Sequence, residues 1–437
     1  MNDTAATTAP ASVPEALSPI PAAPASAAPR PEAGTVLGGR KGIAPLTLLV
    51  VVGALMTVSA LATDAMLPAF PAMAAHFSVS DAVIQSVVSV FMLGYALPHL
   101  VVGSFADRFG RRPVLLLGLG VYLLGGVIAW AAPSLPLLLA GRFVQGLGAS
   151  AGPILSRAVL RDLYQGRELG RMLSFAMIFF GAAPLLAPAV GAMLLGLGSW
   201  RAIFIFLVLV AVVLALLVWL VLPETAPRKD RDALNLPGIW RNARAIVTDP
   251  VSAWIVLVMA LVHSGLMSYL LSAPALYIGY FGLDEGGFAL VFAIVASMTL
   301  LAQPLNVRLL RTNSPVRILR FVIPFFVLVS ATLVAQVALG VASLPSFTIN
   351  LMAFFVAFSL TLANGTTVAL DPHRERAGMA SGLMGFAQLA LGTALGSLVA
   401  GFADRGPLPF ALGLLVLSLL SYPALRMAFR RRASAGV

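Results

Sequence analysis

The sequence predicts an all-α membrane protein with twelve transmembrane helices in two sets of six. Hydrophobic residues make up 59% of the 437 residues and charged residues 10%, whereas soluble domains contain about 25% charged residues. A soluble chain of this length could not bury so much apolar surface. Long runs without charged residues recur along the chain, and their length matches the ~20 residues that a helix needs to cross the hydrocarbon core of a bilayer.

Apolar runs and the breakers between them predict where each helix begins and ends. The twelve helices are expected at residues 43–68, 80–103, 114–132, 135–158, 172–197, 201–222, 251–273, 286–308, 316–339, 345–367, 378–401 and 407–427.

The connections between these helices predict the domains. Most connections are short, but residues 223–250 are polar and separate two halves of similar length. The first 42 residues are rich in Ala, Pro, Ser and Thr and lack an apolar core, which favours disorder. We expect a disordered cytoplasmic tail, a six-helix bundle, a cytoplasmic linker, a second six-helix bundle and a cytoplasmic tail at residues 1–42, 43–222, 223–250, 251–428 and 429–437.

The basic residues predict the orientation. On these helices, 25 of the 28 Lys and Arg lie on one side of the membrane, and the positive-inside rule makes that side cytoplasmic, with both termini there. The net charge of +11 therefore follows from topology, and we expect no nucleic-acid partner. The chain has no cysteine, which excludes disulfides and thiolate metal sites. The sequence has no nucleotide loop, metal cluster or nucleophilic triad, so we expect no metal, no cofactor and no enzymatic activity.

Residues 103–113 form a charged loop between two apolar runs. An ordinary cytoplasmic loop would explain its arginines alone. The whole pattern, Gly-x-x-x-Asp-Arg-x-Gly-Arg-Arg, resembles motif A of the major facilitator superfamily. That resemblance implies the major facilitator fold and a conformational latch in which Asp107 bonds across the two bundles in the outward-open form. The latch residues would be Gly103, Asp107, Arg108, Gly110, Arg111 and Arg112.

Asp64 is the one acidic residue that lies well inside an expected span. Placing a carboxylate there costs roughly 2.5–3.5 kcal/mol on insertion scales, so such residues usually serve a function. Protonation would remove the charge, which makes Asp64 a natural proton carrier. The alternative is that the first helix ends earlier and Asp64 is solvated at the outer mouth.

Arg142 is the basic counterpart of Asp64. It lies within the expected fourth span and shares a helix face with Gln145. Because lipid offers a guanidinium no partner, Arg142 should face the bundle interior. We expect Asp64 and Arg142 to form the proton-coupling site. The alternative is a structural arginine that donates to backbone carbonyls.

The fifth span carries two prolines four residues apart between two glycines, which bend a helix and allow close packing. This pattern resembles motif C of the antiporters in the superfamily, although Ala183-Pro184 stands where Gly-Pro is usual. The residues of this expected antiporter motif are Gly181, Pro184, Pro188 and Gly191.

Longer segments resemble the bicyclomycin-resistance (Bcr/CflA) drug:proton antiporters. They are Thr63 to Pro71, Gly141 to Gly146, Arg157 to Tyr164, Ser199 to Phe204 and Ala377 to Gly382. The resemblance implies a monomeric, proton-driven exporter of drugs in the bacterial inner membrane. Where that branch has Met-Tyr after the aspartate, this chain has Ala-Met, which affects the substrate more than the fold.

Polar, aromatic and methionine side chains on several spans could line a substrate cavity, and they are equally consistent with packing. His99 and His263 could relay protons or could simply be hydrogen-bonded to a neighbour. Alternative functions are export of a natural metabolite, such as an amino acid or a siderophore-like compound, and a non-transporting sensor; two equal halves and one buried acid argue against the sensor. The expected cavity residues are Phe91, Tyr95, Gln145, Met177, Met267, Tyr269, Asn364, Phe386 and Gln388.

Overall fold

The computed structural model describes residues 45–226, 244 and 248–434, and these belong to one compact unit, Ile43–Val437. The expected N-terminal tail, nearly all of the charged part of the linker and the last three residues lie outside the described residues. The described residues are almost entirely helical, as the sequence predicts.

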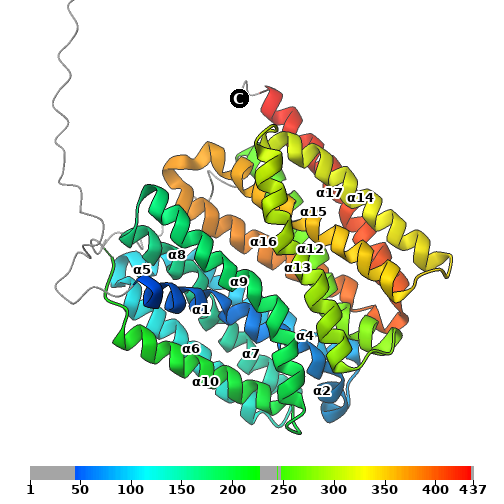
Figure 1. Cartoon of the computed structure of the whole chain (residues 1–437), viewed down its shortest axis with the longest axis horizontal. Helices are drawn as coiled ribbons and strands as arrows, with labels where there is room; N and C mark the ends of the chain where they lie inside the picture. The colour runs from blue at the N-terminus through cyan, green and yellow to red at the C-terminus, as the bar shows by residue number, and fades with distance from the viewer. Residues whose placement is uncertain (1–44, 227–243, 245–247, 435–437) are drawn as a thin grey trace, which may run out of the picture. The chain divides into compact units, whose positions relative to one another are not determined.

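The first half of the chain forms helices that lie side by side at the lower left of Figure 1. Their bounds are α1 Pro45–Asp64, η1 Leu67–Ala69, α2 Phe70–Phe77, α3 Asp81–Ile84, α4 Ser86–Ala96, η2 Leu97–Leu100, α5 Val102–Phe109, α6 Arg111–Ala131, α7 Leu135–Ala149, α8 Ala151–Leu163, α9 Gly166–Leu195 and α10 Arg201–Leu220.

The second half forms a corresponding set at the upper right of Figure 1. Its elements are α12 Pro250–Pro274, η3 Ala275–Tyr280, α13 Glu285–Leu310, α14 Pro315–Ala338, α15 Leu344–Leu370, η4 Asp371–Arg376, α16 Ala377–Ala400, η5 Ala403–Arg405 and α17 Pro407–Ser434.

Eleven continuous helical stretches of the described chain are long and apolar enough to cross a membrane. The expected fourth span is the remaining crossing, because it consists of two shorter helices, α7 and α8, with Ser150 between them. Pro153 causes the interruption, since it has no N–H to donate to the carbonyl of Ala149. Together the two helices are as long as the other crossings, and the prediction of twelve spans is confirmed.

The first span does not end at residue 68, where the sequence predicts its end. Its helical stretch runs from Leu46 to Phe77. The stretch is not one regular helix: α1 ends at Asp64, and η1 and α2 follow. Pro68 explains this end, since proline cannot donate to the carbonyl four residues before it, which here belongs to Asp64. The acid therefore lies at a break within the crossing.

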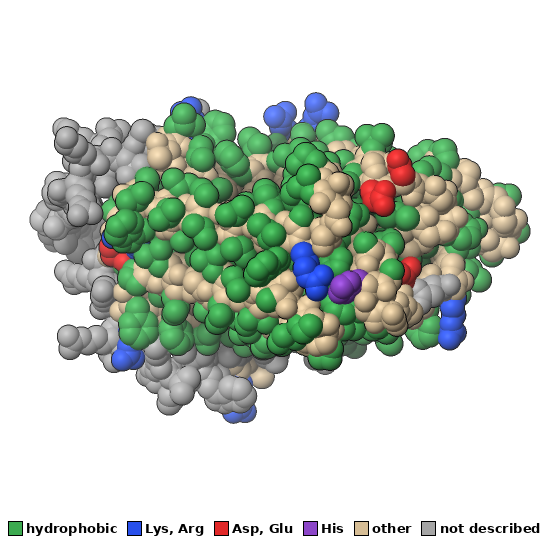
Figure 2. Space-filling model, turned by 90° about the horizontal axis from the view of Figure 1, so that it is seen from below, with side chains coloured by type: hydrophobic (Ala, Val, Ile, Leu, Met, Phe, Trp, Pro, Cys, Tyr) green, Lys and Arg blue, Asp and Glu red, His purple; other side chains and the backbone are tan. Residues whose placement is uncertain are grey.

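The surface is suited to lipid. Large apolar side chains are exposed along several helices, for example Leu186 on α9, 62% exposed, and Phe321 on α14, 68% exposed. The face in Figure 2 is mostly hydrophobic, with few and scattered charged side chains. Such a surface would be unstable in water but matches the hydrocarbon core of a bilayer.

The two halves meet along several pairs of elements. The α4 helix packs on α16, α9 packs on α13, and η1 contacts both α12 and α13. At the first of these contacts, the hydroxyl of Ser397 donates to that of Ser89 at 2.8 Å. The turn that follows Asp64 therefore touches the second half directly.

Glycines allow the helices of the first half to approach closely. A Cβ on Gly146 of α7 would overlap the carbonyl oxygen of Phe91 on α4, whereas a Cβ on Gly120 of α6 would meet nothing within 4 Å. Small residues at such crossings are the usual means of helix association in membranes.

We therefore expect Gly146→Ala to destabilise the purified protein by about 1–3 kcal/mol, the usual cost of overpacking, and to lower its melting temperature in detergent. Gly120→Ala is the matched control and should leave the melting temperature unchanged or raise it, because alanine favours a helix. Equal melting temperatures for the two variants would contradict the packing described here.

Candidate functional site

Asp64 is buried at the break between α1 and η1, with 4% of its surface exposed. The hydroxyl of Thr63 donates to its Oδ1 at 2.8 Å. The ion pairs among the described residues do not include Asp64. The earlier alternative, a solvated acid at the outer mouth, is at odds with this burial, although α1 does end at Asp64.

Arg142 is completely buried in the first half. Its guanidinium donates to the carbonyl of Val87 on α4 at 3.1 Å and to that of Ala62 on α1 at 3.0 Å. It also donates to Oε1 of Gln145 at 2.7 Å and lies 4.2 Å from the centre of the Phe91 ring. Arg142 is thus bonded to three helices and is not ion-paired with Asp64, which is the geometry of the structural alternative.

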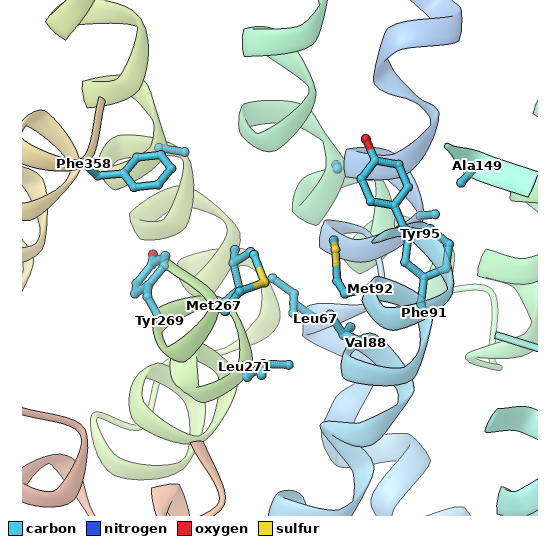
Figure 3. Packing of buried hydrophobic residues seen from close by; sticks show 14 of the residues in the cluster. Leu67, Val88, Phe91, Met92, Tyr95, Ala149, Met267, Tyr269, Leu271 and Phe358 are labelled. Carbon is cyan, nitrogen blue, oxygen red and sulfur yellow. The ribbon is translucent and has the colours of Figure 1, made fainter. Parts of the chain in front are cut away.

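Several expected cavity residues gather where the halves meet. Figure 3 shows Met92 of α4 and Met267 of α12 on either side of Leu67. Phe91 and Tyr95 stack on the α4 side, with ring centres 6.3 Å apart. Aromatic and thioether groups therefore pack together where the halves meet.

Other expected cavity residues lie elsewhere. Met177 is exposed on α9, and Phe386 lies half-buried on α16. Asn364 is buried within the second half, where its amide donates to Oδ1 of Asn306 on α13 at 2.8 Å. Gln388 on α16 contacts His263 at 3.3 Å. These four are not part of the cluster in Figure 3.

Four buried polar atoms on α12 and η3 have no hydrogen-bond partner among the described residues: His263 Nε2, Tyr269 Oη, Ser272 Oγ and Tyr277 Oη. Tyr269 and Tyr277 are close enough to interact, but their hydroxyls make no hydrogen bond of normal geometry. The sequence analysis did not single out Ser272 and Tyr277. Polar residues on an otherwise apolar span that is buried on most sides would have indicated them.

The fifth span joins Asp64 to the second half. A Cβ on Gly181 would overlap Leu300 of α13, and one on Gly191 would overlap the carbonyl oxygen of Ala65, the residue after Asp64. Pro184 and Pro188 lie between these contacts inside the continuous helix α9. The expected antiporter motif thus packs against both the proton-site candidate and the opposite half.

The charged loop is held by ion pairs within the first half. Arg111 binds Asp107 at 2.5 Å and Asp162 at 3.1 Å, and its backbone N–H donates to Oε1 of Glu224 at 2.8 Å. Gly110 ends α5 with φ 107°, and a Cβ there would overlap Glu224. Sequence reasoning gave no role to Asp162 or Glu224, because their distance from the loop in sequence hides the contact.

The other latch residues make weaker contacts in this conformation. Arg112 donates to the carbonyl of Trp219, and the guanidinium of Arg108 lies 5.5 Å from the Phe109 ring centre. A Cβ on Gly103 would meet nothing within 4 Å. Asp107, 48% exposed, pairs within its own half, so the bond across the halves that was expected for the outward-open form is not made here.

Comparisons with known proteins agree with this architecture. The family model described as Major Facilitator Superfamily matches residues 52–397. The "Bicyclomycin resistance protein homolog" of Haemophilus influenzae is 30% identical over 86% of this chain and 94% of its own length. The "Multidrug resistance protein MdtL" of Shewanella oneidensis is 28% identical over 75% of this chain and 81% of its own length.

Solved structures show the same fold at lower identity. A bacterial homologue of the human lysosomal transporter Spinster, in an inward-facing and occupied conformation, superposes with a TM-score of 0.69 at 18% identity, over 90% of this chain and 98% of the other. A D-xylose–proton symporter superposes with a TM-score of 0.66 at 15% identity, over 86% and 97%. The chain is a multi-pass membrane transporter, not an enzyme, and it belongs to the Major Facilitator Superfamily.

Proposed function

We propose that this protein is a proton-coupled antiporter that exports amphipathic small molecules or drugs across the bacterial inner membrane by alternating access. The observation that carries the proposal is Asp64, a carboxyl group that is buried at a helix break where the first half touches the second and that has no ion-pair partner among the described residues. The relatives named for bicyclomycin and multidrug resistance support the substrate class.

The proposed orientation follows from the side of the membrane on which most of the arginines lie. The side with the loop at residues 103–113 faces the cytoplasm, as do both termini, in accord with the positive-inside rule. The protein acts as a monomer and exchanges its substrate for protons.

The proposed cycle depends on whether the Asp64 carboxyl is charged or protonated. A buried carboxylate without a counter-ion is costly, and a proton removes that cost. In the outward-open form Asp64 takes up a proton from outside. After the change to the inward-open form the proton leaves to the cytoplasm and substrate enters between the halves, so that substrate and proton exclude one another.

Arg142 serves this cycle as a positioning residue. Its bond to the carbonyl of Ala62 fixes the helix turn immediately before Asp64. Because its other donors go to Val87 and Gln145, the guanidinium is already satisfied and leaves the carboxyl free to titrate.

The central test is Asp64→Asn, which we expect to abolish proton-coupled export because an amide cannot release a proton. In inverted vesicles, addition of a drug should change the lumenal pH with the parent protein and leave it unchanged with the variant. Asp284→Asn is the control, since Asp284 caps α13 through Gly287 and asparagine caps equally well. A parental pH response from Asp64→Asn would show that Asp64 is not the coupling residue.

For Arg142 we expect Arg142→Lys and Arg142→Ala to fail alike, through loss of monodisperse protein in detergent. An ammonium group lacks the planar fork that reaches acceptors on three helices. If Arg142→Lys instead retained transport, and well-folded Arg142→Ala shifted the pH midpoint of drug binding, an electrostatic role would replace the positioning role.

Asp107→Asn should slow turnover in reconstituted vesicles and leave substrate affinity nearly unchanged, because Asp107 lies in the charged loop, away from the cluster between the halves. Substrate affinity is measured on the same preparation, with Asp284→Asn as the control. A loss of affinity as large as the loss of turnover would place the loop in the binding pathway and would rule out the latch.

A further inference from the structure

His263 carries a buried polar atom that the proposed cycle does not use. The residue lies on α12 and is 6% exposed. Its Nδ1 contacts the side-chain nitrogen of Gln388 on α16 at 3.3 Å. Its Nε2 has no hydrogen-bond partner among the described residues.

The orientation of the Gln388 amide assigns the proton on the His263 ring. In this structure the amide nitrogen faces Nδ1, and because an amide nitrogen can only donate, Nδ1 is assigned as the acceptor. In a neutral imidazole the other nitrogen is then protonated. His263 therefore presents an Nε2–H donor that has no acceptor.

The ring is held in this orientation by its neighbours. A Cβ on Gly392 of α16 would come 2.5 Å from Cδ2 of the ring, so the imidazole rests directly on the backbone of that helix. The ring centre of Phe358 on α15 lies 6.0 Å away. The imidazole is therefore packed against two other helices, α15 and α16.

His263 lies one helical turn from a residue of α12 that reaches the first half. Met267 follows His263 by one helical turn and shares its face of α12. Figure 3 shows Met267 pointing toward Leu67 and Met92 of the first half, with Phe358 on the same side as Met267. A substrate between the halves would therefore pass close to His263.

We propose that His263 is a substrate-binding residue whose Nε2–H donates to an acceptor oxygen, such as a carbonyl, of an uncharged aromatic substrate. Phe358 and Met267 would hold the apolar body of that substrate. A site with a fixed donor favours ligands that carry an acceptor over analogues that lack one. A cationic ligand gains nothing from the same donor. This inference rests on the proposed export function and specifies part of its substrate class.

The test is equilibrium binding to the purified transporter in detergent, with probes that differ in one group. Fluorenone and fluorene have the same aromatic body and differ in the carbonyl, and tetraphenylphosphonium reports on folding and on the rest of the site. We expect the parent protein to bind fluorenone about tenfold more tightly than fluorene, the ratio for one net hydrogen bond.

His263→Phe should remove this preference and leave the affinities for fluorene and tetraphenylphosphonium unchanged. His263→Gln should restore part of the preference, because its amide N–H can donate in place of the imidazole. A structural role would not produce this rescue, since it would lower the affinities of all three ligands together.

Three results would overturn the inference: no preference for fluorenone in the parent protein, a preference that survives His263→Phe, or a joint loss of all three ligands in both variants. Binding in detergent needs no proton gradient, so these results are independent of the vesicle experiment on Asp64.

Discussion

The enclosed guanidinium of Arg142 is the constraint on which the first bundle depends. Several N–H donors must find acceptors where neither water nor lipid supplies any. They find them on α1, α4 and α7, at Ala62, Val87 and Gln145. The three helices are therefore fixed relative to one another at this depth, and the glycine contacts between α4 and α7 keep them close enough for these bonds.

This arrangement has a consequence for Asp64. The guanidinium of Arg142 is satisfied by carbonyl and amide oxygens, and among the described residues the Asp64 carboxyl is not bound in an ion pair, whose attraction would hold it ionised. Pro68 breaks the helix at Asp64. Gly191 allows α9 to pack against the backbone carbonyl of Ala65, the residue after Asp64. The proposed proton site thus lies where the first span, the fifth span and the opposite half meet, and a change in the contact between the halves would reach it directly.

The sequence predicts the fold well because length and apolarity alone define a membrane crossing. All twelve crossings were found this way, and the glycine that needs a positive φ at position 110 was visible in the charged loop. The exceptions have local causes: Pro68 and Pro153 interrupt crossings that the apolar pattern treats as uniform. Proline signals a break, but the pattern does not say whether the chain continues as a helix beyond it.

The site was harder to predict, because its contacts join residues far apart in the chain. The buried charges Asp64 and Arg142 were evident from the free-energy cost of placing a charge in a membrane. The backbone carbonyls that Arg142 binds could not be predicted, because every residue has such a carbonyl. Asp162 and Glu224 support the charged loop from distant segments for the same reason. Glycine at position 103 is not explained by this conformation, in which space is open around it, so any need for glycine there belongs to another conformation of the cycle.

The proposed exchange of proton for substrate is tested most directly by the number of protons released when a substrate binds. Tetraphenylphosphonium can be titrated into the purified parent protein by calorimetry near neutral pH, in two buffers that differ in ionisation enthalpy. If substrate and proton exclude one another at Asp64, the binding enthalpy will differ between the buffers by an amount that corresponds to proton release. Identical enthalpies in both buffers across the neutral range would contradict the exchange of proton for substrate.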